Sequence, residues 1–401
     1  MGGADIDVVV IGAGVAGSTA AIGLAREGLG VALVDRAAFP RHKVCGCCLN
    51  ADAVRMLECL GLNSALRRAG ATPIDRIEIR SENKSVRVNS QGGLAVSRYT
   101  LDGLLHDAAA EAGCRVIDQT TARINRVPEP SEARVPVECS SPTLGQRRGV
   151  MNAKIVLVAD GLAGSCVAGI EGARRTTKPN SLRGYGAQLP AGQHAVCRGE
   201  VAMHCGPGGY VGTVVLEDGS LDIAAAMTPA WVKAHRGPAG AVEAIAKHPS
   251  LRSTTLQDLA WRATAPLTGG RQTRWLPRVF FLGDSAGYVE PFTGEGMAWA
   301  MRSARALQPI AVRAAATWDD RHGTAWQHAY RRAVEQRQWR CKLFAQLLRR
   351  PRLLGSMIGL ASLLPTSARQ AAARPLLPPL FRPTPATAST PALGPEEFAA
   401  P

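Results

Sequence analysis

Three glycines near the start of the chain have the spacing needed to hold a diphosphate group. They follow the pattern Gly-x-Gly-x-x-Gly at Gly12, Gly14 and Gly17. The first permits a tight turn, the second lets the backbone approach the phosphates, and the third lets a helix pack closely on a strand. A helix that begins here presents free N–H groups and a positive dipole to phosphate oxygens. Asp35, further along, could accept hydrogen bonds from the hydroxyls of an adenosine ribose.

The surrounding sequence supplies the elements that such a motif needs. Residues 7–11 (DVVVI) are a short apolar run typical of a buried parallel strand. Apolar residues then recur at helical spacing over 18–25, and residues 31–34 (VALV) form a second strand that Asp35 closes. A strand, a glycine turn, a helix, a strand and an acid within about 30 residues is the context in which this motif binds a dinucleotide.

Composition and charge narrow the class of protein. The chain has 401 residues, of which 46% are apolar and 20% charged, and its formal net charge is +15. This is the composition of a folded globular protein, and no apolar run is long enough to predict a transmembrane helix. The ten cysteines follow no secretory signal and lack zinc-ligand spacing, so we expect free thiols in the reducing cytoplasm and no metal site. No nucleic-acid-binding motif accompanies the excess of arginine, so we expect no nucleic-acid partner.

Further strands and helices are expected along the chain. Residues 155–159 (IVLVA) and 279–282 (VFFL) are two more apolar strands, and an acidic residue beside a glycine follows each of them. Strand-like runs with glycine turns occupy 73–88 and 181–228. The remaining pattern predicts helices at 99–112, with Thr100 as the cap, at 231–247, and from about 294 to 305.

Four of these segments together resemble one family. They are the glycine unit, Asp160-Gly161, the segment 283–287 (GDSAG) and the segment 291–297 (PFTGEGM). In this order they resemble the FAD-dependent aromatic hydroxylase-like superfamily, over roughly residues 5–310. Residues 39–46 (FPRHKVCG) resemble the segment after the second strand in the geranylgeranyl reductase-type branch, which neighbours the flavin-dependent halogenases.

The resemblance implies roles for residues that are far apart in the chain. Asp284 would bind the ribityl chain of FAD, since a carboxylate accepts charge-assisted hydrogen bonds from hydroxyls. A helix that begins near Gly294 would present its backbone N–H groups to the flavin ring. Arg98 and Arg41 would contact the phosphates. The residues so assigned to the cofactor are Gly12, Gly14, Ala16, Gly17, Asp35, Arg36, Arg41, Cys45, Gly46, Arg98, Asp160, Gly161, Gly283, Asp284, Pro291, Gly294, Gly296 and Met297.

Two positions leave the chemistry of the site open. Asp160-Gly161 resembles a motif that serves FAD and, in some members, NAD(P)H, but Cys166 and Val167 stand where an arginine usually follows. Cys45 matches a cysteine of the reductase branch, and its thiol could hydrogen-bond, line a substrate tunnel, react if its pKa is lowered, or pack inertly. No catalytic acid or base is assigned, and besides Cys45 the candidates by residue type alone are His42, His194 and His204.

The expected fold is α/β. It comprises a Rossmann-like FAD-binding domain, an interleaved α+β substrate domain on a mixed sheet, and a helical C-terminal region. The basic segment 331–364 could contact a membrane surface or cap the FAD-binding domain. The expected ranges are 1–72, 97–175 and 265–330 for the FAD-binding domain, 73–96 and 176–264 for the substrate domain, 331–375 for the helical region and 376–401 for a disordered tail.

Flavin chemistry leaves several reactions open. The favoured one is an NAD(P)H-dependent monooxygenase that hydroxylates an aromatic or polyketide-like substrate through a flavin C4a-hydroperoxide shielded from water. The alternative is an alkene reductase of the geranylgeranyl type, acting on a prenyl or lipid substrate. A halogenase is disfavoured because the Trp-x-Trp-x-Ile-Pro motif of the tryptophan-type halogenases is missing, since no two of the seven tryptophans are two residues apart. A non-enzymatic flavin-binding protein is the last alternative. In each enzyme the partner is an apolar or aromatic small molecule; its identity, the nicotinamide preference and the oligomeric state stay open.

Overall fold

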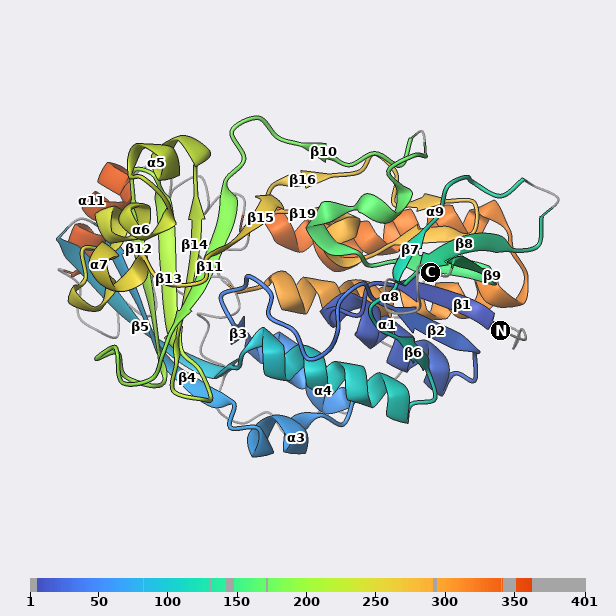
Figure 1. Ribbon diagram of the computed structural model, residues 1–401, viewed down its shortest axis with the longest axis horizontal. Helices are drawn as coiled ribbons and strands as arrows, with labels where there is room; N and C mark the ends of the chain where they lie inside the picture. The colour runs from blue at the N-terminus through green and yellow to red at the C-terminus, as the bar shows by residue number, and fades with distance from the viewer. Residues whose placement is uncertain are drawn as a thin grey trace.

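The computed structural model describes residues 6–81, 83–129, 132–141, 148–170, 172–290, 294–339, 341 and 351–362. Within them the chain forms two large sheets, one at each end of the long axis of the molecule (Figure 1). The longer helices surround the first sheet, and short helices lie against the second. Pro291 and the tail expected at 376–401 lie outside the described residues.

The first sheet is built mainly from parallel strands. β1 (Ile6–Ile11) pairs in parallel with β2 (Val31–Val34) on one side and with β9 (Arg148–Val158) on the other. Their apolar runs are continuous because the sheet is covered on both faces. The strand order is β17-β18-β9-β1-β2-β6, and β8 joins β7 to β9. The other bounds are β6 Arg115–Ile117, β7 Thr121–Arg123, β8 Val135–Ser140, β17 Trp275–Leu276 and β18 Val279–Phe281.

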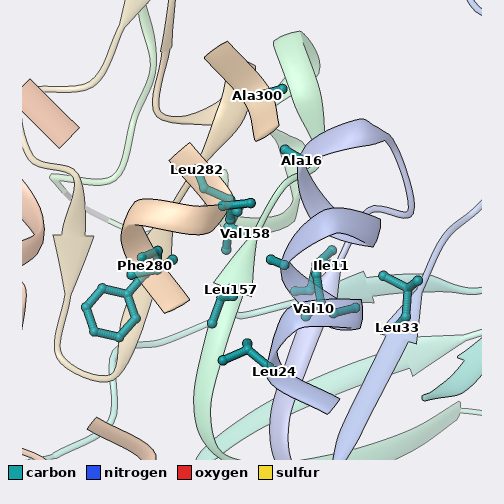
Figure 2. Close-up of a cluster of buried hydrophobic side chains, with 14 of the residues drawn as sticks. Val10, Ile11, Ala16, Leu24, Leu33, Leu157, Val158, Phe280, Leu282 and Ala300 are labelled. Carbon is teal, nitrogen blue, oxygen red and sulfur yellow. The ribbon is translucent and has the colours of Figure 1, made fainter. Parts of the chain in front are cut away.

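Two helices begin at the same edge of this sheet. α1 (Val15–Arg26) connects β1 to β2 and packs against the long helix α8 (Gly296–Ala316). Figure 2 shows the core beneath them, where Leu24 of α1 lies over Val10 and Leu157 of the strands. The remaining helices of this half are α2 Ala51–Cys59, α3 Asn63–Arg68, α4 Arg98–Glu111 and α9 Asp320–Tyr330, which a π-helical turn at Arg331–Glu335 follows.

The second sheet is mixed. Its order is β15-β11-β14-β13-β12-β4-β5-β3, and β12 and β4 are the parallel pair in an otherwise antiparallel arrangement. Leu221 and Ile223 of β14 belong to an apolar cluster with helix α6 (Pro238–Ala246), whereas Ala224 and Ala226 line a cavity on the opposite side. The bounds are β3 Cys48–Leu49, β4 Thr72–Ser81, β5 Lys84–Ala95, β11 Arg183–Leu189, β12 Glu200–Gly206, β13 Gly209–Val215, β14 Leu221–Met227 and β15 Arg262–Pro266.

A small third sheet lies between the two large ones (Figure 1). It consists of β10 (Thr176–Thr177), β16 (Gly269–Gly270) and β19 (Gly287–Tyr288), in that order. The strands of the second large sheet thus come from residues 48–95 and 183–266. The domain boundaries expected from the sequence stay a prediction.

Two helix predictions need correction. The helix expected at 99–112 is α4, but its N-cap is Ser97, whose hydroxyl accepts the N–H of Thr100, so Thr100 is not the cap. The single helix expected over 231–247 is two helices, α5 (Pro229–Ala234) and α6 (Pro238–Ala246). The helix breaks between them because Gly237 has a φ of 128° and Pro238 has no N–H with which to continue the ladder. A short helix α7 (Ser253–Leu256) follows.

Helix α11 (Pro351–Ser362) packs on β4 and β5 of the second sheet. Its Leu354 and Ile358 are buried in the same apolar cluster as Ile77 and Val88, and Met357 is exposed. This helix therefore covers the second sheet, whereas Val334 and Cys341, also within the segment 331–364, are buried in the apolar core of the first half. The cap expected on that half is thus confirmed for these two residues. Across the part of the chain that the structure describes, no helix is both long and apolar enough to cross a bilayer. Membrane contact of 331–364 and the cytoplasmic location stay predictions.

Candidate active site

A cavity of about 460 Å³ lies where the two large sheets meet. The first half of the chain contributes the starts of α1 and α8 and the end of β9 to its wall, and the second sheet contributes its inner face. The segment 42–48 lines the cavity between them. Helix N-termini and the carboxyl ends of parallel strands therefore open into one cavity, which is where α/β sheets bind ligands.

The glycine loop shapes one end of the cavity. Gly12 has a φ of +105°, and a Cβ on it would lie 2.4 Å from the carbonyl oxygen of Ala159. A Cβ on Gly17 would lie 1.8 Å from the carbonyl oxygen of Gly12, so only glycine lets α1 approach the turn. Gly14 differs, because a Cβ there would meet nothing closer than 3.5 Å. Its missing side chain leaves room in the cavity, as a bound diphosphate requires.

Two arginines flank Gly14. Arg98 makes a bidentate ion pair with Asp102, with both N–O distances at 2.8 Å, and both side chains are buried. Arg41 lies 3.4 Å from the same carboxylate. A Cβ on Gly14 would be 3.5 Å from Nη2 of Arg41 and 3.9 Å from Nη2 of Arg98. Arg41 also lies 3.8 Å from Asp35, so the two guanidinium groups face two carboxylates, and the N-terminus of α1 adds its positive dipole where a phosphate could bind.

Asp35 has a different environment from the one expected. One carboxylate oxygen accepts the N–H of Ala13 at 2.8 Å and the other accepts the N–H of Ala37 at 2.9 Å. Asp35 is buried and is not part of the cavity wall, whereas its neighbour Arg36 is. The carboxylate thus holds the glycine turn to the end of β2, and the assignment of Asp35 to a ribose stays a prediction.

The end of β9 supplies a carboxylate to the cavity. Oδ2 of Asp160 accepts the N–H of Cys166 at 3.0 Å, while Oδ1 is buried without a hydrogen-bond partner among the described residues. Gly161 has a φ of +74° and also lines the cavity. The charge of Arg271, a residue distant in the sequence, acts on Asp160, and its Nε donates to the carbonyl oxygen of Ser285 at 2.9 Å. No local spacing could have indicated Arg271.

The start of α8 forms the opposite wall. Gly283 has a φ of +58°, and a Cβ on it would lie 2.7 Å from the Cβ of Ala16, so this glycine lets the two halves of the site meet. Asp284, Gly294, Gly296 and Met297 all line the cavity. Pro291 lies outside the described residues.

Lys43 is a cavity residue that the sequence did not single out. Desolvation lowers the pKa of its ammonium group, and the positive charge of Arg98 acts in the same direction. The carboxylate of Asp284 opposes this shift. Lys43 belongs to the segment 39–46, which resembles the geranylgeranyl reductase-type branch, but the position of the lysine in that segment did not indicate that it lines the cavity.

Cys45 lines the cavity beside Gly46 and belongs to a hydrogen-bonded cluster. The pKa of its thiol is lowered to about 5, because the Cys47 thiol hydrogen-bonds to it and the Arg98 guanidinium lies beside it. The pKa of Cys47 is raised by the same hydrogen bond and by burial. Burial also raises the pKa of Asp222 of β14. Its carboxyl group hydrogen-bonds to Cys47 and Gln188. One of its two oxygens, Oδ2, has no hydrogen-bond partner among the described residues. Sequence reasoning missed Asp222, although it is the acid in an otherwise apolar strand.

The second half of the chain contributes mostly apolar residues to the cavity wall, together with Tyr210, Thr213, Arg262 and Thr264. The small ones are Gly184, Gly212, Ala224 and Ala226. The larger ones are Ile77, Val201, Met203 and Leu267. We refer to these eight residues as the apolar slot. A hydrocarbon fits such a surface better than a polar ligand does, because a buried polar group without a partner is destabilising.

The three histidines proposed by residue type do not converge. His42 lines the cavity, and its ring centroid is 5.0 Å from that of Tyr99. His204 is buried on the other face of the second sheet, where burial lowers its pKa to about 4 and His248 lies 5.9 Å away between ring centroids. His194 contacts the carbonyl oxygen of Gly219 at 2.9 Å. Only His42 reaches the cavity.

The residues of this cavity fit FAD. Gly14 leaves the space that a diphosphate needs, and Arg41 and Arg98 provide the counter-charge. The unpartnered Oδ1 of Asp160 can accept a hydrogen bond from a hydroxyl or a ring N–H. No group of three or more metal-ligating side chains occurs in the described ranges. Of the residues assigned to the cofactor, Gly14, Ala16, Arg36, Cys45, Gly46, Arg98, Asp160, Gly161, Asp284, Gly294, Gly296 and Met297 line this cavity, whereas Gly12, Gly17, Asp35, Arg41 and Gly283 do not. Their contacts with FAD stay a prediction.

Comparison with known proteins points in the same direction. Residues 5–192 match the family described as FAD binding domain. A kynurenine 3-monooxygenase of Salinispora arenicola is 27% identical over 332 residues, which are 72% of this chain and 69% of that protein. A menaquinone reductase of Mycolicibacterium smegmatis is 29% identical over 324 residues, or 75% and 74% of the two chains. The structure of a geranylgeranyl bacteriochlorophyll reductase-like protein of Thermoplasma acidophilum has the same fold, with a TM-score of 0.74 over 93% of this chain and 96% of that one at 18% identity.

Proposed function

Because this chain is an FAD-dependent oxidoreductase of the aromatic hydroxylase-like superfamily, we propose that it saturates a carbon–carbon double bond in an apolar, prenyl-like substrate. The electrons come from NAD(P)H by way of FAD. The substrate lies in the apolar slot, against the face of the cavity that carries Cys45. The first support for this proposal is that the slot and the diphosphate site share one cavity.

The residues of the cavity would hold FAD from both sides. Gly14 would leave room for the diphosphate at the N-terminus of α1, where Arg41 and Arg98 could donate hydrogen bonds to it. Asp284 accepts hydrogen bonds from the ribityl hydroxyls. Gly294, Gly296 and Met297 place the N-terminus of α8 at the flavin, where the helix dipole stabilises negative charge. Bound FAD supplies the hydride chemistry that no amino-acid side chain provides.

Cys45 is the observation that favours reduction over oxygenation. The hydrogen bond from Cys47 and the charge of Arg98 lower the pKa of Cys45 to about 5, so that its thiol is ionised at neutral pH. Thiolates are oxidised readily by activated oxygen. A cavity that exposes one is therefore better suited to a reaction in which oxygen takes no part.

Protons for the reduction are held beside the same position. Saturating a double bond consumes a hydride and a proton. The Cys47 thiol and the Asp222 carboxyl hydrogen-bond to each other. The hydrogen bond to Cys45 and burial raise the pKa of Cys47, and burial raises the pKa of Asp222, which favours the protonated form of both groups. Cys47 lines the cavity, so it can deliver a proton to the substrate and recover one from Asp222. The apolar slot keeps water from competing for the reacting carbon.

An anaerobic reaction tests the proposal. The protein with FAD is reduced by NADPH without oxygen and mixed with geranylgeraniol or a menaquinone as the probe, in deuterated buffer. We expect a product that has gained two hydrogen atoms, one of them deuterium. Unchanged probe without oxygen, followed by an oxygenated product when air is admitted, would refute reduction.

Monooxygenation is the second candidate, and it was the favoured reaction from the sequence. The similarity to a kynurenine 3-monooxygenase supports it. It requires incorporation of an oxygen atom from O₂ into an aromatic or polyketide-like compound, which labelled oxygen in the same experiment would detect. A flavin-dependent halogenase would instead require halide, and a flavin-binding protein without activity would hold FAD that NAD(P)H does not reduce.

A further inference from the structure

Three cysteines follow one another within four residues at the wall of the cavity: Cys45, Cys47 and Cys48. They differ in access. Cys45 is half-buried and faces the cavity, whereas Cys47 and Cys48 are only 1% and 6% exposed. A small molecule that enters the cavity therefore meets the Cys45 thiol first. The reaction proposed above uses Cys47 as a proton donor, but it does not require a bond between the two sulfur atoms.

The backbone turns the second thiol back toward the first. Cys47 has a φ of 51°, which residues with a side chain rarely adopt. In this conformation its Sγ lies 3.6 Å from the carbonyl oxygen of Cys45, and the two thiols hydrogen-bond to each other. Strained backbone is found preferentially at functional positions. The strain here has a clear result, which is to hold two thiols in contact.

Charge distinguishes the two thiols. Arg98 hydrogen-bonds to Cys45 and, together with the Cys47 thiol, favours its thiolate. Cys48 has the opposite environment, because it donates to the carbonyl oxygen of Gly46 at 2.9 Å and burial raises its pKa. Burial also raises the pKa of Cys205, to about 12. A thiolate at the cavity with a protonated thiol beside it is the arrangement of peroxide-reactive cysteine pairs.

We propose that Cys45 and Cys47 form a peroxide-sensitive redox pair, in which Cys45 reacts and Cys47 resolves the product as an intramolecular disulfide. In the first step the Cys45 thiolate attacks one oxygen of hydrogen peroxide, the O–O bond breaks, and the hydroxide that leaves takes a proton from solvent to become water. Sulfur is oxidised to the sulfenic acid and peroxide is reduced. In the second step Cys47 sulfur attacks Cys45 sulfur, the S–O bond breaks, and the Cys47 proton leaves with the hydroxyl as water.

The disulfide has a consequence for the site. It removes the thiolate from the cavity wall and the proton-bearing thiol from contact with Asp222. If oxygen reacted with reduced flavin in a side reaction, hydrogen peroxide would form close to Cys45 and would oxidise the pair. Turnover would then stop until a dithiol reductant reduced the disulfide. Only this effect on turnover rests on the proposed function; the reaction of the pair with peroxide does not.

Trypsin isolates the pair on one peptide. Cleavage after Lys43 and Arg55 releases residues 44–55 (VCGCCLNADAVR), which contain these three cysteines and no others. The protein as purified with its FAD is treated with hydrogen peroxide, then with iodoacetamide, and digested. We expect the peptide to lose two hydrogen atoms and to carry a single alkyl group, on Cys48. Dithiothreitol given before iodoacetamide should restore three alkyl groups.

Two matched variants assign the partners. Cys47→Ser should abolish the two-hydrogen loss and leave a Cys45 sulfenic acid that dimedone traps. Cys48→Ser should form the disulfide as the wild type does. The rate of Cys45 oxidation should change less than twofold between pH 6 and pH 8. For a thiol with an ordinary pKa of about 8.5, the thiolate fraction would rise about 80-fold over the same range.

Two results would overturn the proposal. One is a wild-type peptide that still takes three alkyl groups after peroxide has oxidised the exposed Cys59 and Cys197. The other is a disulfide that persists in Cys47→Ser. Neither result depends on finding a substrate, so failure here is distinguishable from failure of the proposed reductase activity.

Discussion

Replacing Gly14 with valine separates cofactor binding from folding. Gly14 has an extended backbone, with φ of −82° and ψ of −175°, which valine adopts without strain. A Cβ there meets no atom closer than 3.5 Å, so the empty site accepts the side chain. The two valine methyl groups extend further, into the space beside Arg41 and Arg98 where the diphosphate would lie. Excess side-chain volume in a packed site costs about 1–3 kcal/mol, and this corresponds to a loss of FAD affinity of about 5- to 150-fold.

Fluorescence titration of the apoprotein with FAD measures this loss, and thermal unfolding without FAD measures the fold. Gly169→Val is the matched control, because Gly169 is exposed, has no atom within 4 Å of its Cβ position and is not part of the cavity wall. We expect the control to bind FAD as the wild type does. An unchanged dissociation constant for Gly14→Val would refute the placement of the diphosphate, as would an equal loss in both variants.

Three further outcomes are expected. Gly17→Ala should lower the thermal midpoint of the apoprotein, because its Cβ would lie 1.8 Å from the carbonyl oxygen of Gly12; an unchanged midpoint would contradict the close packing of α1. Burial raises the pKa of Asp222, so the native state keeps a proton that the unfolded chain loses above about pH 3.9. The free energy of unfolding therefore falls by about 1.4 kcal/mol for each pH unit as the pH rises toward the native pKa. Asp222→Asn cannot ionise, so its stability relative to wild type in urea should grow between pH 5 and pH 8, and a constant difference would count against a buried neutral acid. Ile358→Ala should cost about 2–5 kcal/mol if α11 packs on the second sheet in solution, and no change in urea unfolding would argue that it does not.

The parts of the site that sequence predicts are those set by local geometry. The glycine loop, its helix and the two strands beside it all lie within about 30 consecutive residues. The positive φ and the close packing that the loop requires are therefore indicated by the glycines themselves. The described residues 283–290 and 294–297 follow the same logic, because a turn and a helix N-terminus are local features. These are the residues whose positions agree best with the expectation.

The parts that sequence could not predict depend on contacts between distant segments. Asp222 reaches Cys47 only because the fold brings β14 and the segment 42–48 together around one cavity, and no spacing links the two residues. Arg271 reaches Asp160 in the same way. Asp35 illustrates a different reason, since the backbone N–H groups of Ala13 and Ala37 occupy a carboxylate that the motif alone would leave for a ligand. The break between α5 and α6 is different, because Gly237-Pro238 is a pair that ends helices and is visible in the sequence itself.

The visible absorption spectrum of the purified protein, recorded before and after incubation with excess FAD and desalting, tests the central claim most directly. We expect a yellow protein that retains one FAD for each chain after desalting. A protein that stays colourless after this treatment, although circular dichroism shows it to be folded, would contradict the account, because the diphosphate site, the flavin wall and the apolar slot would then serve some other ligand.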